Sequence, residues 1–147
     1  MRFLAPAIVA FVVLGMPACG PTSVPTASVT IAGAHLSLPR GSYCWSSWGK
    51  AECADSAGPD LLLSTGYLEP RATGPGVSAD VEFSSPPESL DVSRVWSSTG
   101  GLGPVGHSGS HFDLPSQRGT YVFDVSARWP EGKVDFLLAV QVGPATG

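Results

Sequence analysis

The chain has 147 residues, enough for one domain with a hydrophobic core, and its net charge at pH 7 is −4. Hydrophobic residues make up 43% of it, which argues against a disordered polyelectrolyte, and the lack of any run of Lys or Arg argues against nucleic acid as a partner. Its 18 glycines and 14 prolines, together with only 14% charged residues, favour a turn-rich β protein over a helical bundle.

The first segment has the features of an export signal. After Met1 and Arg2 comes the apolar stretch FLAPAIVAFVVLG, which is too short for a comfortable membrane span. The following MPAC resembles the lipobox of bacterial lipoproteins, in which a small residue precedes a cysteine that is lipidated and becomes the new N-terminus. The resemblance implies that residues 1–18 are a leader and that Cys19 carries a lipid. That lipid would anchor the protein in the bacterial cell envelope, facing outside the cytoplasm. The alternative is an ordinary secretory peptide that leaves Cys19 free.

A tether and a first pair of strands follow the leader. Residues 19–27 are rich in Pro, Ser and Thr and predict a flexible tether. We expect the folded domain over residues 28–143, with residues 144–147 as a tail. Val29 and Ile31 share one face of a strand. In the following HLSLP the apolar residues are Leu36 and Leu38, so the alternation changes phase, and a bulge or turn is predicted at Gly33 between the two segments.

Two cysteines and three aromatic residues are concentrated in the next stretch, GSYCWSSWGKAEC. Once Cys19 is lipidated, only Cys44 and Cys53 remain, and we expect them to form a disulfide in an oxidising exterior. Trp45 is expected to pack against this disulfide or the core, as large aromatic residues do in β-sandwiches. The segment therefore contains a structural cross-link and the packing around it.

The polar surroundings of Trp48 favour a different role. An aromatic side chain on a polar, disulfide-linked loop is typical of a binding surface, because rigidity lowers the entropy cost of binding. We therefore take Trp48, Lys50 and Tyr43 as candidate binding residues.

A small acidic group comes next. Glu52, Asp55 and Asp60 could supply oxygen ligands to calcium, but their spacing matches no calcium-loop motif, and solvated loop carboxylates are the preferred interpretation. The run LLLSTGYL is too short for a helix, so no helix is predicted after the leader.

The middle of the chain returns to strand patterns. VSADVEF alternates cleanly, with four apolar residues on one face, namely Val77, Ala79, Val81 and Phe83. The two prolines of SSPPES end this strand. In SLDVSRVW, Leu90 and Val92 share a face, with Trp96 in phase and Arg94 interrupting the pattern.

The glycine-rich stretch that follows contains two histidines as HSGSH. His107 and His111 are weak candidates for a metal site, since residues four apart share a face on a strand and can converge in a loop. A structural zinc wants four ligands and a catalytic zinc three, and the sequence supplies no third histidine nearby. No metal and no cofactor are therefore predicted.

The last two strands are the clearest elements. TYVFDVSARW and KVDFLLAVQV both alternate with period two around the turn PEG, which predicts a hairpin. The segment PSQRGTYVF resembles the entry to the penultimate strand of immunoglobulin-like domains, where a tyrosine hydroxyl bonds to upstream backbone; here that residue is Tyr121. The predicted fold is an all-β, antiparallel two-sheet sandwich, immunoglobulin-like, with about seven strands.

These features together resemble a loose group of small exported bacterial lipoproteins. The matching stretches are SYCWSSWGKAECAD and GTYVFDVSARWPEGKVDFLLAVQV, a Y-C-W…C-A-D segment and a terminal hairpin. The group has no assigned activity, so the resemblance implies a fold and a disulfide but no function.

Three functions are compatible with the sequence. The preferred one is a lipid-anchored, monomeric sandwich without catalytic activity that binds an unknown protein or glycan or supports envelope assembly. No G-x-S-x-G elbow and no phosphate-binding loop with its lysine occur, so an enzyme is not predicted. The alternatives are a metal-binding protein that uses His107 and His111, and an inhibitor that acts through the disulfide-linked loop.

Overall fold

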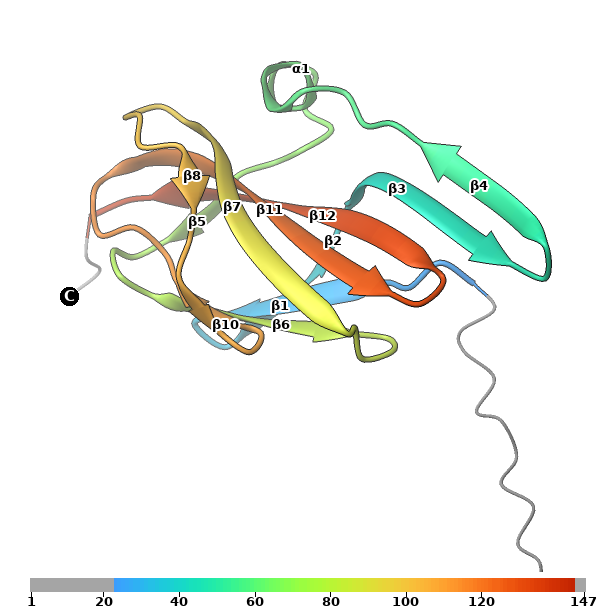
Figure 1. The fold of residues 1–147 in the computed structure, drawn as a ribbon. Coiled ribbons are helices and arrows are strands. Elements are labelled where there is room, and N and C mark those ends of the chain that lie inside the picture. The colour runs from blue at the N-terminus through green and yellow to red at the C-terminus, as the bar shows by residue number, and fades with distance from the viewer. Residues whose placement is uncertain (1–22, 145–147) are drawn as a thin grey trace, which may run out of the picture.

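Two β-sheets face each other and enclose the core, as predicted (Figure 1). The computed structural model describes residues 23–144, so the predicted leader, Cys19 and the end of the tail lie outside the described residues. One sheet has the strand order β2-β1-β6-β10-β9. Its strands are β1 (Ala27–Ile31), β2 (Ala34–Leu38), β6 (Ser78–Phe83), β9 (His107–Ser108) and β10 (His111–Asp113).

The second sheet has seven strands. It follows the path β4-β3-β12-β11-β7-β8, and β5 pairs in parallel with β12 off this path. Its strands are β3 (Arg40–Ser47), β4 (Lys50–Ala54), β5 (Arg71–Thr73), β7 (Ser89–Ser97), β8 (Gly103–Pro104), β11 (Gly119–Trp129) and β12 (Gly132–Val142). Twelve strands thus occur in residues 23–144, against about seven expected, because strands of two or three residues are too short to show an alternating pattern.

The core between the sheets uses the strand faces that the alternation predicted. The inward residues of β11 and β12 are Tyr121, Phe123, Val125, Ala127, Trp129, Val134, Phe136, Leu138, Val140 and Val142. At one end, the ring centroid of Trp129 lies 5.8 Å from those of both Trp45 and Phe83. The aromatic residues of three strands therefore pack together and close this end of the sandwich.

The tyrosine contact predicted from the immunoglobulin-like resemblance is present. The Tyr121 hydroxyl donates to the carbonyl oxygen of Gln117 at 2.8 Å and accepts from the Thr99 hydroxyl at 3.2 Å. The ring is buried, so these bonds satisfy a phenol that would otherwise lose its contact with water.

The prediction that no helix follows the leader is wrong. A short helix, α1 (Pro59–Ser64), begins with proline in its first turn and buries Leu62 against the outer face of the seven-stranded sheet. A second, smaller core forms there, from Leu62, Leu68, Val122, Leu137 and Ala139. The helix has no stability of its own at this length, and packing on the sheet holds it in place.

The phase predicted for Trp96 is also wrong. The pairing of β7 with β11 shifts register between Val122 and Phe123, so Arg94 lies opposite Phe123 and Trp96 lies opposite Val122. Trp96 consequently packs in the smaller outer core, and its indole N–H donates to the carboxylate of Asp60. A β-bulge moves every later side chain of a strand to the other face, and the sequence pattern did not reveal it.

The chain enters the domain earlier than the predicted tether boundary. Val24 packs against the core, Pro25 is buried, and the backbone N–H of Thr26 bonds to the Ser84 hydroxyl at 3.0 Å. Among residues 23–144, no helix combines the length and the apolar character needed to cross a bilayer.

Candidate functional site

The β3–β4 hairpin extends beyond the rest of the sandwich (Figure 1). Within the described chain, β4 pairs with β3 alone, and all five of its residues are exposed. At its base, β3 lies close to β12, where a Cβ on Gly132 would come within 2.0 Å of the Cys44 carbonyl oxygen. The hairpin is therefore fixed at its base and free at its tip.

The predicted disulfide between Cys44 and Cys53 is present. The two cysteines are direct partners in the β3–β4 register, with their Cα atoms 4.1 Å apart. The expectation was a cross-link that holds a loop, whereas the bond joins two strands that are already hydrogen-bonded. It makes the hairpin below the turn resistant to opening.

The tip of the hairpin is a two-residue turn of Trp48 and Gly49. Their φ values are 52° and 74°, and Ser47 pairs with Lys50 on either side of them. Two positive φ values in a two-residue hairpin loop indicate a type I′ turn, whose first position favours Asn, Asp or Gly. A tryptophan there carries backbone strain, and its side chain is 81% exposed.

Beneath Trp48 lies a groove of about 580 Å³ that also contains the other two predicted binding residues, Tyr43 and Lys50. Trp45 and Glu52 line the groove as well. Trp45 is only 4% exposed, because its ring packs in the core. The structure thus brings the three predicted binding residues together, and the buried Trp45 lies where the groove meets the core.

The groove also contains a cationic residue that sequence reasoning missed. The guanidinium of Arg40 lies 5.2 Å from the centroid of the Tyr43 ring. Residues three apart face opposite sides of a regular strand, but the pairing of β3 with β12 shifts register between Phe136 and Val134. No signal in the sequence marks this irregularity.

Two polar side chains of the groove are hydrogen-bonded to each other. The Tyr43 hydroxyl donates to the carboxylate of Glu52. This hydrogen bond is the largest cause that raises the pKa of Tyr43, so the phenol stays protonated. The bond leaves the carboxylate of Glu52 charged, so Arg40 and Lys50 together exceed it by one positive charge, which is available to a partner.

The two histidines proposed for metal binding do not face each other. In the β9–β10 hairpin, His107 pairs with Phe112 and His111 pairs with Ser108, which places the imidazoles on opposite faces of the ribbon. His111 bonds instead to Asp80, with Nδ1 2.8 Å from the carboxylate oxygen. This bond and the charge of Asp80 raise the pKa of His111.

The acidic group is likewise dispersed. Glu52 bonds to Tyr43, and Asp60 bonds to Trp96 on another part of the seven-stranded sheet. The part of the chain that the structure describes contains no group of three or more His, Cys, Asp or Glu side chains placed to hold a metal ion. Comparison with protein-family models, with curated proteins and with solved structures found no match to this chain.

Proposed function

We propose that the protein is a lipid-anchored, non-catalytic binding domain of the bacterial cell envelope. Its contact surface is the tip of the β3–β4 hairpin together with the groove beneath it. The observation that carries the proposal is Trp48, which is 81% exposed at a φ of 52°. The strained backbone disfavours the folded state, and a ring that stays exposed contributes no burial to offset this strain, whereas contact with a partner would bury the ring.

The composition of the groove supports a particular kind of partner. Trp48 and Tyr43 offer aromatic surface, while Arg40 and Lys50 offer cationic hydrogen-bond donors. Aromatic residues and arginine are the side chains enriched in binding hot spots, and the disulfide reduces the entropy lost on binding. A partner with a flat apolar face beside an acidic group fits this set, either on a protein loop or on an acidic glycan.

The position of the groove relative to the expected anchor supports a partner close to the membrane. Ser23 and Val24, the first described residues of the chain, line the groove. Ser23 lies four residues after Cys19, and four residues span at most roughly 14 Å when the chain is fully extended. A lipid on Cys19 would therefore hold the groove near the bilayer surface, where envelope proteins and glycans attached to that membrane are in reach.

The test is capture of partners from envelope fractions by the tagged full-length chain. Three forms are compared: wild type, Trp48→Ala, and Tyr67→Ala, which removes an aromatic side chain that is 64% exposed elsewhere on the surface. We expect the same protein or glycan with wild type and Tyr67→Ala, and at least tenfold lower recovery with Trp48→Ala. Equal recovery with Trp48→Ala would show that the hairpin tip is not the contact surface.

The projecting hairpin also favours one special case, in which the partner is an enzyme and the tip blocks its active site. A rigid protruding segment suits this role because little conformational entropy is lost when it enters a cleft. Inhibition of envelope hydrolases by the intact protein, and its loss in Trp48→Ala, would identify this case. If every hydrolase tested stays fully active, the inhibitory role is excluded for those enzymes.

A further inference from the structure

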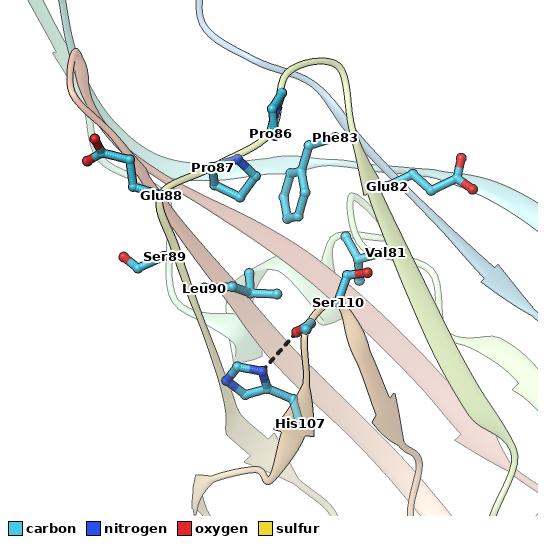
Figure 2. Close-up of a pocket in the computed structure, with 11 residues that line it drawn as sticks. Val81, Glu82, Phe83, Pro86, Pro87, Glu88, Ser89, Leu90, His107 and Ser110 are labelled. Atoms are coloured by element: carbon cyan, nitrogen blue, oxygen red, sulfur yellow. Dashed lines mark hydrogen bonds between the residues drawn. The ribbon is translucent and has the colours of Figure 1, made fainter.

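A second hollow lies where the chain crosses from the five-stranded to the seven-stranded sheet (Figure 2). Its volume of about 670 Å³ is in the range of small-molecule sites. The walls come from β6, the β6–β7 connection, the start of β7 and the β9–β10 hairpin. The main lining residues are Val81, Phe83, Pro86, Pro87, Leu90 and His107. We call this hollow the β6–β7 cleft.

The side chains that point into the β6–β7 cleft are apolar. In Figure 2, Phe83 and Leu90 extend toward each other across it, whereas the carboxylates of Glu82 and Glu88 point away. Of the residues drawn there, none places a charged group inside. Because removing an ion from water without a counter-charge is costly, the interior favours an uncharged molecule with an apolar body.

The walls of the cleft are held in place by contacts with β11 and β12 of the seven-stranded sheet. The indole N–H of Trp129 donates to the carbonyl oxygen of Ser85 at 3.2 Å, and the backbone N–H of Glu88 donates to the carbonyl oxygen of Arg128 at 2.7 Å. The ring of Phe83 rests on the core, 5.8 Å from the Phe136 centroid. A cleft fixed in this way exists before a ligand arrives, so binding does not have to pay for its formation.

His107 lines the mouth of the cleft, where its imidazole is exposed. Its Nδ1 lies 2.9 Å from the carbonyl oxygen of Gly109 (dashed line in Figure 2). A carbonyl can only accept, so Nδ1 carries the proton, and in the neutral ring Nε2 is then an acceptor. Among residues 23–144, no side chain or backbone group bonds to Nε2. His107 is exposed, so Nε2 is open to solvent, and a donor group on the ligand can bond to it in place of water.

We propose that the β6–β7 cleft binds a small uncharged molecule with an aromatic or aliphatic body and a single hydrogen-bond donor, a hydroxyl or N–H group. The body packs between Phe83 and Leu90, and the donor bonds to Nε2 of His107. This site is independent of the β3–β4 hairpin, which shares no lining residue with it.

The probe for this proposal is N-phenyl-1-naphthylamine, a neutral fluorescent molecule with two aromatic groups and one N–H. It is titrated into the full-length chain in detergent, with the signal of protein-free detergent subtracted. Ser110→Trp places an indole at the mouth of the cleft, on an exposed turn residue. Ser108→Trp adds the same ring to the opposite face of the ribbon, since Ser108 pairs with His111, and it serves as the matched control.

We expect saturable binding to wild type and to Ser108→Trp, and at least tenfold weaker binding to Ser110→Trp. His107→Phe tests the hydrogen bond: it should weaken binding of the amine about three- to tenfold and leave 1-phenoxynaphthalene, which lacks the donor, unchanged. Binding that does not saturate, or that Ser110→Trp and Ser108→Trp reduce equally, would overturn the site. An equal effect of His107→Phe on both probes would overturn the role of Nε2.

Discussion

Trp48 shows at the scale of one residue how the proposed binding role and folding stability can conflict. Its backbone has a φ of 52°, and its neighbour in the turn is Gly49. Asparagine occupies this conformation with little strain, and Asn-Gly is the preferred pair for a type I′ turn. The strain is therefore specific to the side chain that the sequence places there.

We predict that Trp48→Asn raises the free energy of unfolding by roughly 0.5–1 kcal/mol, because it relieves this strain and the exposed indole contributes little burial that could be lost. Urea denaturation of both proteins measures the change. The same variant should lose partner capture as Trp48→Ala does. A clear loss of stability instead would mean that the indole packs on the domain and stabilises it by more than the backbone strain costs.

Asp124 is a second residue whose environment opposes its ordinary charge. It lies half-buried on the outer face of β11, near Asp135 of β12, in a small cavity below the segment before α1. Burial, and then the negative charge of Asp135, raise the pKa of Asp124 to about 6, while Lys133 acts in the opposite direction. Between pH 3.8 and about 6, the carboxyl group of Asp124 therefore keeps its proton in the folded protein and loses it in the unfolded chain.

The sign of the pH dependence follows from this difference. Between the unfolded pKa of 3.8 and the folded value of about 6, the folded state binds more protons, so stability falls as pH rises through that window. After a discount for partial exposure, we expect a loss of about 1–2 kcal/mol between pH 4 and pH 7 from this group. Asp124→Asn should remove this part of the dependence in denaturation curves at several pH values.

The control for Asp124→Asn is Asp91→Asn, which changes an exposed carboxylate on β7. It should leave the shape of the pH profile as in wild type. If Asp124→Asn and wild type show parallel profiles between pH 4 and pH 7, then Asp124 is not the group responsible.

At the scale of the element, the β3–β4 hairpin has a fully exposed outer strand. All five residues of β4 are exposed, and β4 pairs with β3 alone in residues 23–144. By contrast, β11 and β12 pair over eleven residues each and carry much of the core. The outer part of the hairpin can consequently open without unfolding the sandwich, and the Cys44–Cys53 bond opposes that opening.

We predict that Cys44→Ser with Cys53→Ser makes the hairpin locally labile. Closing so short a loop stabilises by roughly 2–3 kcal/mol in the chain-entropy model, so hydrogen exchange of the β3–β4 amides should accelerate at least tenfold. The β11–β12 amides should stay protected, which hydrogen-exchange mass spectrometry reports in the same experiment. Equal acceleration in both hairpins would show that the disulfide stabilises the whole domain.

At the scale of the whole molecule, the sandwich and the expected anchor define an orientation. The groove under Trp48 lies beside the point where the described chain begins, at Ser23 and Val24. The β6–β7 cleft lies in a different part of the fold, lined by β6, β7 and the β9–β10 hairpin. One domain therefore presents two surfaces, one near the proposed membrane attachment and one separate from it.

The anchor itself is tested by Cys19→Ser in the full-length chain. We expect wild type in the membrane fraction, resistant to high salt and released by detergent, because a lipid holds it there. The variant should lose lipid labelling and move substantially to the soluble fraction or remain as unprocessed precursor. Lipid labelling of the variant equal to that of wild type would contradict attachment at Cys19.

The sequence alone determined the fold class and the largest elements. Period-two alternation identified the inward faces of β11 and β12, because side chains on a strand alternate regardless of what lies beyond it. The number of cysteines predicted the disulfide between Cys44 and Cys53, and the tyrosine motif predicted the hydrogen bond of the Tyr121 hydroxyl to the upstream backbone. The polar surroundings of Trp48 predicted its exposure. Each of these is a local property, readable within about ten residues.

Only the tertiary structure decided which residues meet. Two register shifts, one beside Arg40 and one beside Trp96, move side chains to the other face of the sheet. The alternation of apolar and polar residues in the sequence does not reveal such bulges. A two-residue reversal separated His107 from His111, although their spacing would align them on a continuous strand. Helix α1 exists because the outer face of the sheet offers it apolar contacts, and the β6–β7 cleft exists because β6, the start of β7 and the β9–β10 hairpin come together around it. Such features depend on neighbours that are distant in sequence, so no local pattern could specify them.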